Sequence, residues 1–353
     1  MRKDRPGWGA GFILQEMVEK HGYSHSDLPD IASVNRYFKE VGLIPLRVPS
    51  RDLPEPKKRS TVRYCHDRWE MDAQGPVNTL GLGYVAMINI KDTKSKAYIM
   101  SFPVMVNSQK HQPKTVHYQW ALRLAFIEWG LPRVIQVDKD SVFYPNTAQS
   151  PFPTLFHLWL LSLGLELDFI KYPPPIKNAM VERSHQTIDR QVLQGQSYSC
   201  WKELWVSCNK RRDLMNRVQV NPYAKSKPAL IAFPNVVKNR RTYEIEKESQ
   251  QMQLKRIYKY LSGCDWYRST SKDKTFSLGG WVYYLKKAKP KTQMHFKFSN
   301  RTKKLICRDA NEQIIDSIPL KGLTIVKIMG STQNQIIKTY KKIGRSRKCP
   351  IES

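Results

Sequence analysis

The stretch that decides the fold is residues 117–138, HYQWALRLAFIEWGLPRVIQVD. Its apolar first part ends at Gly130, which predicts a helix over 117–130, and LPRVIQVD predicts a short buried strand that ends at Asp138. Similar patterns predict strands at 67–73, 83–90 and 96–106 and helices at 153–165 and 178–193. Three strands followed by alternating helices and strands predict an α/β domain with a mixed sheet.

The charge of the chain indicates a polyanionic partner. The 353 residues include 59 Lys and Arg against 30 Asp and Glu, a net charge of +29. Binding to nucleic acid fits this excess because each neutralised phosphate releases condensed counterions. A soluble protein that is basic for another reason, such as a ribosome-associated or membrane-surface protein, is the alternative.

Cysteine and histidine spacing gives no sign of a structural zinc site. The six cysteines contain no CxxC pair, and His21 and His25 have no cysteine pair after them. The N-terminus MRKDRPGWGAGF lacks the apolar run of a signal peptide, and no stretch approaches the roughly 18 apolar residues of a membrane span. We therefore expect a cytoplasmic, nucleoid-associated protein.

Composition and pattern divide the chain into six regions, so a multidomain α/β protein is expected. These are a helix-turn-helix-like segment (1–47), a basic Pro-rich linker (48–63), the α/β core (64–210), a basic helical connector (211–270), a small β-barrel (271–330) and a loose basic tail (331–353).

The N-terminal region predicts two helices. GFILQEMVEKHG at 11–22 stops at Gly22, and IASVNRYFKEVGL at 31–43 follows a cap at Asp30 or Ser33. Two helices with a short link are typical of a helix-turn-helix, whose second helix would present Asn35 and Arg36 to a major groove. A helical hairpin that only packs on the core is the alternative.

Three carboxylates stand where chemistry is expected. Asp72 interrupts a strand, Asp138 ends a strand, and Glu182 belongs to a predicted helix. Burying a lone carboxylate is costly, so each needs a proton, a partner or a metal. Together they would suit two Mg²⁺ or Mn²⁺ ions that assist phosphoryl transfer. Alternatively, Asp138 caps a turn and Glu182 is a solvated helix residue.

At these residues the chain resembles the retroviral-integrase-like DDE transposases of bacterial insertion sequences, over about residues 5–235. Trp69-Glu70-Met71-Asp72 resembles their first catalytic motif, Val137-Asp138 with Phe143 the second, and Tyr172-Pro173-Pro174-Pro175 with Asn178 to His185 the third. The resemblance implies a ribonuclease H-like core in which Asp72, Asp138 and Glu182 are both catalytic residues and metal ligands. It departs from the family at Lys139-Asp140 and at Ala179, where Asn-Gly and Gly are usual.

The family also implies contacts to DNA from residues that flank the glutamate. The candidates are Lys171, Asn178, Arg183, His185, Gln186 and Arg190. For Arg183 and Arg190 a solvated helix face is the alternative. Asp140 and Asp189 are rival acids that we treat as secondary.

The C-terminal part combines charge with aromatic residues. Residues 238–304 contain 18 Lys and Arg against 5 Asp and Glu, interleaved with Trp266, Trp281 and Tyr284. Short runs such as FSLGGWVYYL at 276–285 and LTIVKI at 323–328 predict strands, and five of them predict a small β-barrel with a non-specific DNA surface.

The expected function is therefore metal-dependent 3′-end cleavage and strand transfer of a mobile element. The protein would bind element ends and target DNA as a homo-multimer, with a possible accessory ATPase. Two alternatives remain open: a decayed or domesticated transposase that only binds DNA, and a ribonuclease H-type nuclease that cuts without joining.

Overall fold

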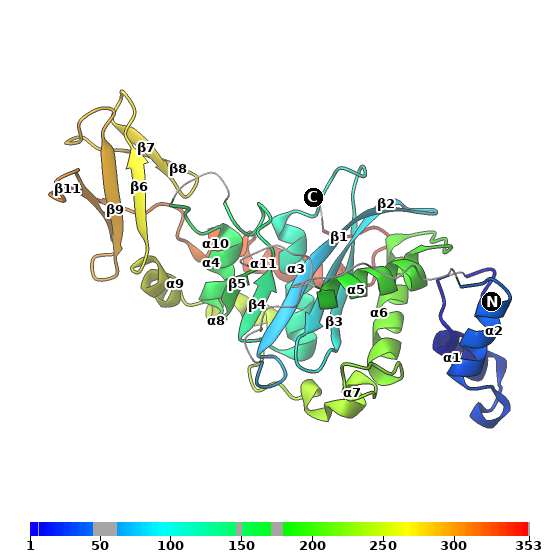
Figure 1. The fold of residues 1–353 in the computed structure, drawn as a ribbon. Coiled ribbons are helices and arrows are strands. Elements are labelled where there is room, and N and C mark those ends of the chain that lie inside the picture. Colours follow the sequence, from blue (N-terminus) through cyan, green and yellow to red (C-terminus); the bar gives the residue numbers. More distant parts are fainter. Residues whose placement is uncertain (6, 45–61, 146–149, 171–178, 352–353) are drawn as a thin grey trace. The chain divides into compact units, whose positions relative to one another are not determined.

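The computed structural model describes residues 1–351 except 6, 45–61, 146–149 and 171–178, and the chain forms two compact units (Figure 1). The first unit combines residues 1–113, 172–240 and 342–353, and the second combines 114–171 and 241–341. Each unit thus joins segments that lie far apart in the sequence. No helix in the described ranges is long and apolar enough to cross a bilayer.

The first unit contains an antiparallel sheet and the helices that cover it. Its elements are α1 (Ala10–His21), η1 (His25–Asp27), α2 (Ile31–Glu40), β1 (Arg68–Thr79), β2 (Gly83–Asp92), β3 (Tyr98–Met105), α5 (Ala179–Ile188), η3 (Asp189–Leu193), α6 (Trp201–Arg217), α7 (Ala229–Ala232) and η4 (Pro234–Val237).

The second unit contains a parallel strand pair, several helices and a β-rich C-terminal part. Its elements are α3 (Thr115–Trp129), β4 (Val134–Val137), α4 (Leu155–Ser162), β5 (Glu166–Phe169), η5 (Ile245–Lys247), α8 (Glu248–Gln251), α9 (Leu254–Leu261), β6 (Asp265–Ser269), β7 (Thr275–Leu278), β8 (Trp281–Tyr284), β9 (Gln293–Ser299), β10 (Lys304–Arg308), β11 (Ile314–Pro319), α10 (Ile325–Met329) and α11 (Gln333–Lys342).

Antiparallel and parallel pairing combine in the main sheet, whose hydrogen-bonded order is β3-β2-β1-β4-β5. β1 pairs antiparallel with β2 and β2 with β3, whereas β4 and β5 are parallel. From Val85 to Asp92 every residue of β2 is buried, as a central strand requires. The predicted mixed α/β sheet is confirmed.

Helix α6 fixes the edge strand β3 of the first unit. The indole Nε1 of Trp201 donates to the carbonyl of Pro103 at 3.1 Å. The side-chain amide of Asn216 makes two bonds to the backbone of Tyr98, at 2.7 and 2.8 Å. These bonds satisfy edge groups of the sheet that would otherwise be open to other chains.

Both predicted N-terminal helices are present, and α2 ends at Glu40, three residues before the predicted limit. α1 ends at Gly22, whose φ of 71° provides a left-handed cap, and the Asp30 side chain accepts the N–H of Ser33 at 2.8 Å at the start of α2. The helices enclose a small core with Trp8, Phe12 and Phe38, and Arg211 of α6 lies 3.6 Å from the Phe12 ring centroid. This arrangement does not confirm a DNA-binding helix-turn-helix.

The C-terminal strands differ from the predicted barrel. Among the described residues they form an open sheet, β11-β10-β9-β6, and a separate hairpin, β7-β8. The run 276–285 is this hairpin and not one strand, because Gly279 (φ 59°) and Gly280 (φ 77°) supply the two positive φ angles that a two-residue turn needs. Phe276 of the hairpin stacks on Phe296 of β9, with ring centroids 4.1 Å apart.

Two further segments are helical where the sequence analysis expected otherwise. LTIVKI contributes to α10, because Thr324 caps it by accepting the N–H of Lys327 at 3.3 Å and Gly330 ends it with a φ of 78°. These end signals outweigh the β-branched residues between them. Residues 333–342, expected as part of a loose tail, form α11, in which Ile336 is buried.

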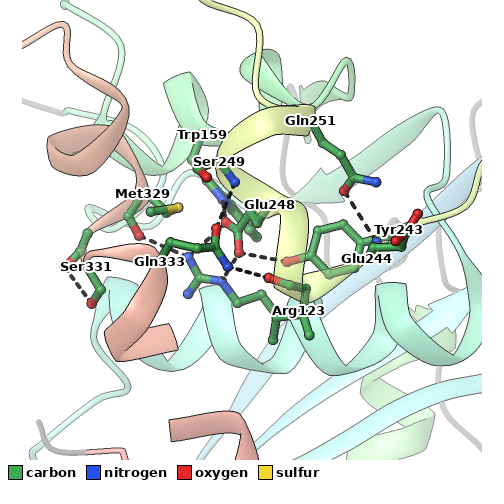
Figure 2. A network of polar contacts seen from close by, with 12 residues as sticks. Arg123, Trp159, Tyr243, Glu244, Glu248, Ser249, Gln251, Met329, Ser331 and Gln333 are labelled. Carbon is green, nitrogen blue, oxygen red and sulfur yellow. Dashed lines mark hydrogen bonds and ion pairs between the residues drawn. The ribbon is translucent and has the colours of Figure 1, made fainter. Parts of the chain in front are cut away.

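A buried ion pair holds the second unit together (Figure 2). Arg123 donates to both carboxylate oxygens of Glu248, at 2.8 and 3.0 Å, and to the carbonyl of Met329 at 3.0 Å. Trp159 and Tyr243 donate to the same carboxylate at 2.6 and 2.7 Å. The network thereby fastens α8 and α10 to α3 and α4.

Candidate active site

Asp72 lies on β1, directly after the fully buried Met71. Strand alternation buries Trp69 and Met71, whereas Asp72 is half-buried and accepts the N–H of Ala73 at 2.8 Å. Directly opposite on β2 is Asn89. Residues in such a pair point to the same face of a sheet, so Asp72 and Asn89 share one face.

Helix α5 covers this face of the sheet. Its buried residues Val181, Ser184 and Ile188 recur at helical spacing. Ile188 belongs to one apolar cluster with Val85 and Met87 of β2. These two residues precede Asn89 at two-residue spacing and therefore lie on the same face of the strand. The sheet face that carries Asp72 is therefore the face on which α5 packs.

Glu182 lies on α5, which packs against the strand that carries Asp72. His185, one turn after Glu182, lies near the backbone of Asp72, which affects the pKa of the imidazole, and Asp189 lies near the side chain of Gln74. Glu182, His185 and Asp189 thus follow one stripe of the helix along β1. Burial raises the pKa of the Glu182 carboxyl and lowers the pKa of His185 to about 4, so His185 is neutral at pH 7.

Asp138 follows β4 in the second unit. All four residues of β4 are buried, and Asp138 is exposed at its end. Its carboxylate accepts the N–H of Asp140 at 3.2 Å, as expected for a residue that caps a turn. Nevertheless, desolvation above the closely packed strand end, followed by the charge of Asp140, raises the pKa of Asp138.

The layer between α5 and the sheet is unusually polar. Lys91 is buried opposite Glu70, with its amine 4.1 Å from the Tyr98 ring centroid. Burial lowers the pKa of Lys91 to about 8; the charge of Glu70 opposes this effect, and Arg183 adds to it. The side-chain polar atoms of Asn89 and Ser101 and the Nε2 of His185 are buried, and they have no hydrogen-bond partner among the described residues.

The predicted DNA-binding residues lie on several surfaces. Lys171 and Asn178 lie outside the described residues. Arg183, Gln186 and Arg190 are exposed on α5 and η3, and the Arg183 guanidinium lies 5.1 Å from the ring centroid of Tyr223. On α2, Asn35 is half-buried and Arg36 is exposed. No observation assigns DNA to any of them.

The carboxylates fit a divalent cation by their chemistry. Asp138 and Glu182 both have raised pKa values in a strongly basic chain, and neither forms an ion pair with a described residue. Carboxylate oxygens are the ligands that Mg²⁺ prefers. Within the part of the chain that is described, no three His, Cys, Asp or Glu side chains form a group that could hold a metal ion, so the three-carboxylate site stays a prediction.

Sequence reasoning missed Asn89 and Ser101. Asn89 is the one amide in the strand pattern GYVAMINI, and Ser101 lies in the next strand. The only available signal was a polar residue inside a buried run, and many such residues simply bond to a neighbouring backbone group. Register and burial were needed to single them out.

Comparisons with known proteins yield similarity in structure only. No family model matches the chain. The catalytic core domain of HTLV-2 integrase, solved in complex with magnesium in a trimeric form, matches 48% of this chain and 97% of its own length, at 17% identity and a TM-score of 0.34. The dimeric form of the same domain matches 47% of this chain and 94% of its own length, at 15% identity and a TM-score of 0.33.

Proposed function

We propose that this protein is a DNA transposase, a metal-dependent polynucleotidyl transferase that releases the 3′ ends of a mobile element and joins them to target DNA. The observation that carries the proposal is the polar layer in which Asp72 and Glu182 lie on adjacent elements, with His185 of α5 near the backbone of Asp72. Such polar groups cost stability in a sheet core, and they are typical of sites that bind a ligand.

Asp72, Asp138 and Glu182 would hold Mg²⁺ or Mn²⁺, two ions in the usual form of this chemistry. When bound, the ions lower the barrier to attack on phosphorus and stabilise the leaving oxygen. Other side chains of the protein would keep the site in place and exclude water from it. Neutral His185 holds α5 against β1, and Trp69 and Met71 keep water from the strand beneath Asp72.

DNA binding would rest on exposed cations. Arg183, Gln186 and Arg190 lie exposed on and after the helix that carries Glu182, where they can contact phosphates near the scissile bond. Asn35 and Arg36 on α2 would contribute to recognition of element ends. The protein would act as a homo-multimer on DNA in the cytoplasm, associated with the nucleoid, with an accessory ATPase as a possible partner.

A joining assay tests the proposal. Labelled duplexes that carry the sequences flanking the gene are incubated with the full chain, plasmid DNA and Mg²⁺ or Mn²⁺. The proposal expects covalent joining of the labelled 3′ end to the plasmid, dependent on metal.

The two alternatives give different products. Nicking without joining would identify a ribonuclease H-type nuclease. DNA binding with neither cutting nor joining in either metal would identify a DNA-binding protein that has lost catalysis, and it would end the proposal.

A further inference from the structure

A cavity of about 680 Å³ lies beside the start of α6 in the first unit. Two cysteines line it, Cys200 at the start of the helix and Cys349 in the C-terminal segment that rejoins this unit. Apolar Trp201 and Ile351 line the cavity as well, and so does the basic Arg347. The fold thus brings to one cavity two thiols that lie far apart in the sequence.

Cys200 occupies the N-cap position of α6, a helix of 17 residues. Its carbonyl accepts the N–H of Glu203 at 3.2 Å, as the carbonyl of an N-cap residue does. N–H groups without helical partners in the first turn stabilise a negative charge there. The backbone of Glu203 accordingly lowers the pKa of the Cys200 thiol most, and the side chains of Ser199 and Arg347 lower it further. The thiolate, which is the reactive form of cysteine, is therefore favoured at this position.

The carboxylate of Glu203 opposes a thiolate at Cys200, together with partial burial of the thiol. The two carboxylate oxygens accept the N–H and the hydroxyl of Ser199, both at 2.8 Å. These bonds are the main reason why the pKa of Glu203 is lowered, and the charge of Arg347 adds to the effect. Because the carboxylate is occupied in this way, its repulsion of the thiolate does not outweigh the helix N-terminus.

The six cysteines of the chain are all described, and they differ in the state of the thiol. Cys200 alone has a lowered pKa, whereas burial raises the pKa of each of the other five. Burial raises the pKa of Cys349 to about 11, so this thiol is protonated at pH 7. The cavity therefore combines a reactive thiol with a second thiol of a different character.

We propose that Cys200 and Cys349 form a reversible redox pair, in which a peroxide oxidises Cys200 and Cys349 then closes a disulfide across the cavity. The Cys200 thiolate attacks one peroxide oxygen, the O–O bond breaks, and the leaving oxygen takes up a proton. The sulfenic acid formed at Cys200 is then attacked by the Sγ of Cys349. The S–S bond forms, the S–O bond breaks, and water leaves with the thiol proton. The two thiols lose two electrons, which the peroxide gains.

The C-terminal segment is suited to this bond. A disulfide needs α-carbons about 4.4–6.8 Å apart. Residues 346–351 belong to no helix or strand, so no regular element has to break when Cys349 approaches Cys200. The bond would fasten this segment to the start of α6 within the first unit. None of these residues belongs to the candidate active site, so the inference does not depend on the proposed function.

Peptide mapping of the oxidised protein tests the pair. The reduced full-length chain is treated at pH 7 with a small molar excess of hydrogen peroxide, its free thiols are alkylated, and it is digested without reduction. A peptide that links Cys200 to Cys349 should be the main oxidation product, and dithiothreitol should release it. Before oxidation, iodoacetamide should modify Cys200 about tenfold faster than Cys65 or Cys264, because a larger thiolate fraction is partly offset by lower nucleophilicity.

Cysteine variants assign the two steps. Cys349→Ser should leave a sulfenic acid at Cys200 that dimedone traps, because the second thiol is missing. Cys200→Ser should yield neither the sulfenic acid nor a linked peptide. Cys264→Ser is the matched control, a half-buried cysteine of the second unit, and it should form the link between Cys200 and Cys349 as the wild type does.

An arginine variant tests the electrostatic part. Arg347→Gln should raise the pH midpoint of Cys200 alkylation and slow this reaction about two- to threefold at pH 7, because the cation near the thiolate is lost. Arg345→Gln, an exposed arginine two residues earlier in the same segment, is the matched control and should change neither quantity.

Three results would overturn the inference. One is a wild type in which Cys200 reacts no faster than Cys65 and no linked peptide forms. Another is a sulfenic acid at Cys200 that persists in the wild type without the link to Cys349. The third is a set of linked peptides that is the same in Cys200→Ser as in the wild type.

Discussion

Carboxylates whose charge the fold partly or wholly desolvates differ in their partners. Glu248 is 0% exposed and accepts bonds from Arg123, Trp159 and Tyr243. Asp138 and Glu182 instead have pKa values raised by burial and no ion pair with a described residue. A fully partnered carboxylate stabilises a structure, whereas a desolvated carboxylate without a cation is a candidate for ligand binding.

The Glu248 network gives a stability prediction at the residue scale. Replacing Glu248 with Gln leaves the buried guanidinium of Arg123 without its counter-charge and should lower the free energy of unfolding by about 3–5 kcal/mol. Urea unfolding of the full-length chain measures this loss.

Glu166→Gln is the control, because the ion pair of Arg133 and Glu166 is exposed to solvent. The exposed fraction of the side chain is 43% for Arg133 and 66% for Glu166. Exposed pairs contribute about 1 kcal/mol or less. Equal effects of the two substitutions would contradict the account of Glu248 as a structural anchor.

Among the elements, those whose limits are set by local signals were predicted well. The strand 134–138 and the helix that ends at Gly130 correspond to β4 and α3, and α1 ends at Gly22. Elements set by distant contacts were not. The short α8 depends on Glu248, whose partner Arg123 lies 125 residues earlier in the chain, and no local pattern can reveal such a pair.

The candidate site was predictable to a similar extent. Asp72 and Glu182 were singled out by motif, and the structure places them on adjacent elements. Asn89 and Ser101 were not, because an amide or hydroxyl in an apolar strand has no distinctive pattern. They stand out only by strand register and because the described residues offer their side chains no hydrogen-bond partner, and both are properties of the folded chain.

Strands β6 and β9 hold a pH-dependent contact in the second unit. His295 of β9 bonds to Asp265 of β6 at 2.8 Å and to Glu312 at 3.0 Å. Burial alone would lower the pKa of His295, but the hydrogen bonds to Asp265 and Glu312 outweigh burial and raise it above 6.5. The added stability is therefore fully present below about pH 6.5 and is lost as the pH rises through the raised pKa.

His295→Gln should remove this pH dependence. Thermal unfolding measured from pH 5.5 to about pH 9 should show a decline for the wild type that the variant lacks. The Asp265 carboxylate, whose pKa is lowered chiefly by His295, stays ionised throughout this range and adds no slope of its own. Parallel curves for the two proteins would refute the role of His295.

At the scale of the whole molecule, charge dominates the expected behaviour. The chain carries a net charge of +29. Exposed lysines flank the hairpin β7-β8, on which Trp281 and Tyr284 are 39% and 59% exposed. Affinity for DNA should therefore fall steeply with salt, because bound cations release counterions from phosphates.

Charge-reversing substitutions test which part of the chain binds DNA. Lys286→Glu with Lys287→Glu, at the end of β8, should reduce the slope of log affinity against log salt by about two. The matched control is Lys202→Glu with Lys210→Glu, an exposed pair on α6 of the first unit, which should leave the slope nearly unchanged. Filter binding over a salt series measures both, and a flat response of the wild type would count against DNA as the partner.

The central claim is that Asp72, Asp138 and Glu182 act as one metal-binding set, and strand joining by isosteric variants tests it most directly. Asp72→Asn, Asp138→Asn and Glu182→Gln keep the shape but remove the charge that holds the cations. Each should lower the joining rate about 1,000-fold or more while DNA binding persists, and double variants should be no worse than single ones. Asp140→Asn and Asp189→Asn should retain much of the activity. Joining at the wild-type rate by any of the three variants, or loss of joining in Asp140→Asn with retention in Asp138→Asn, would contradict the account.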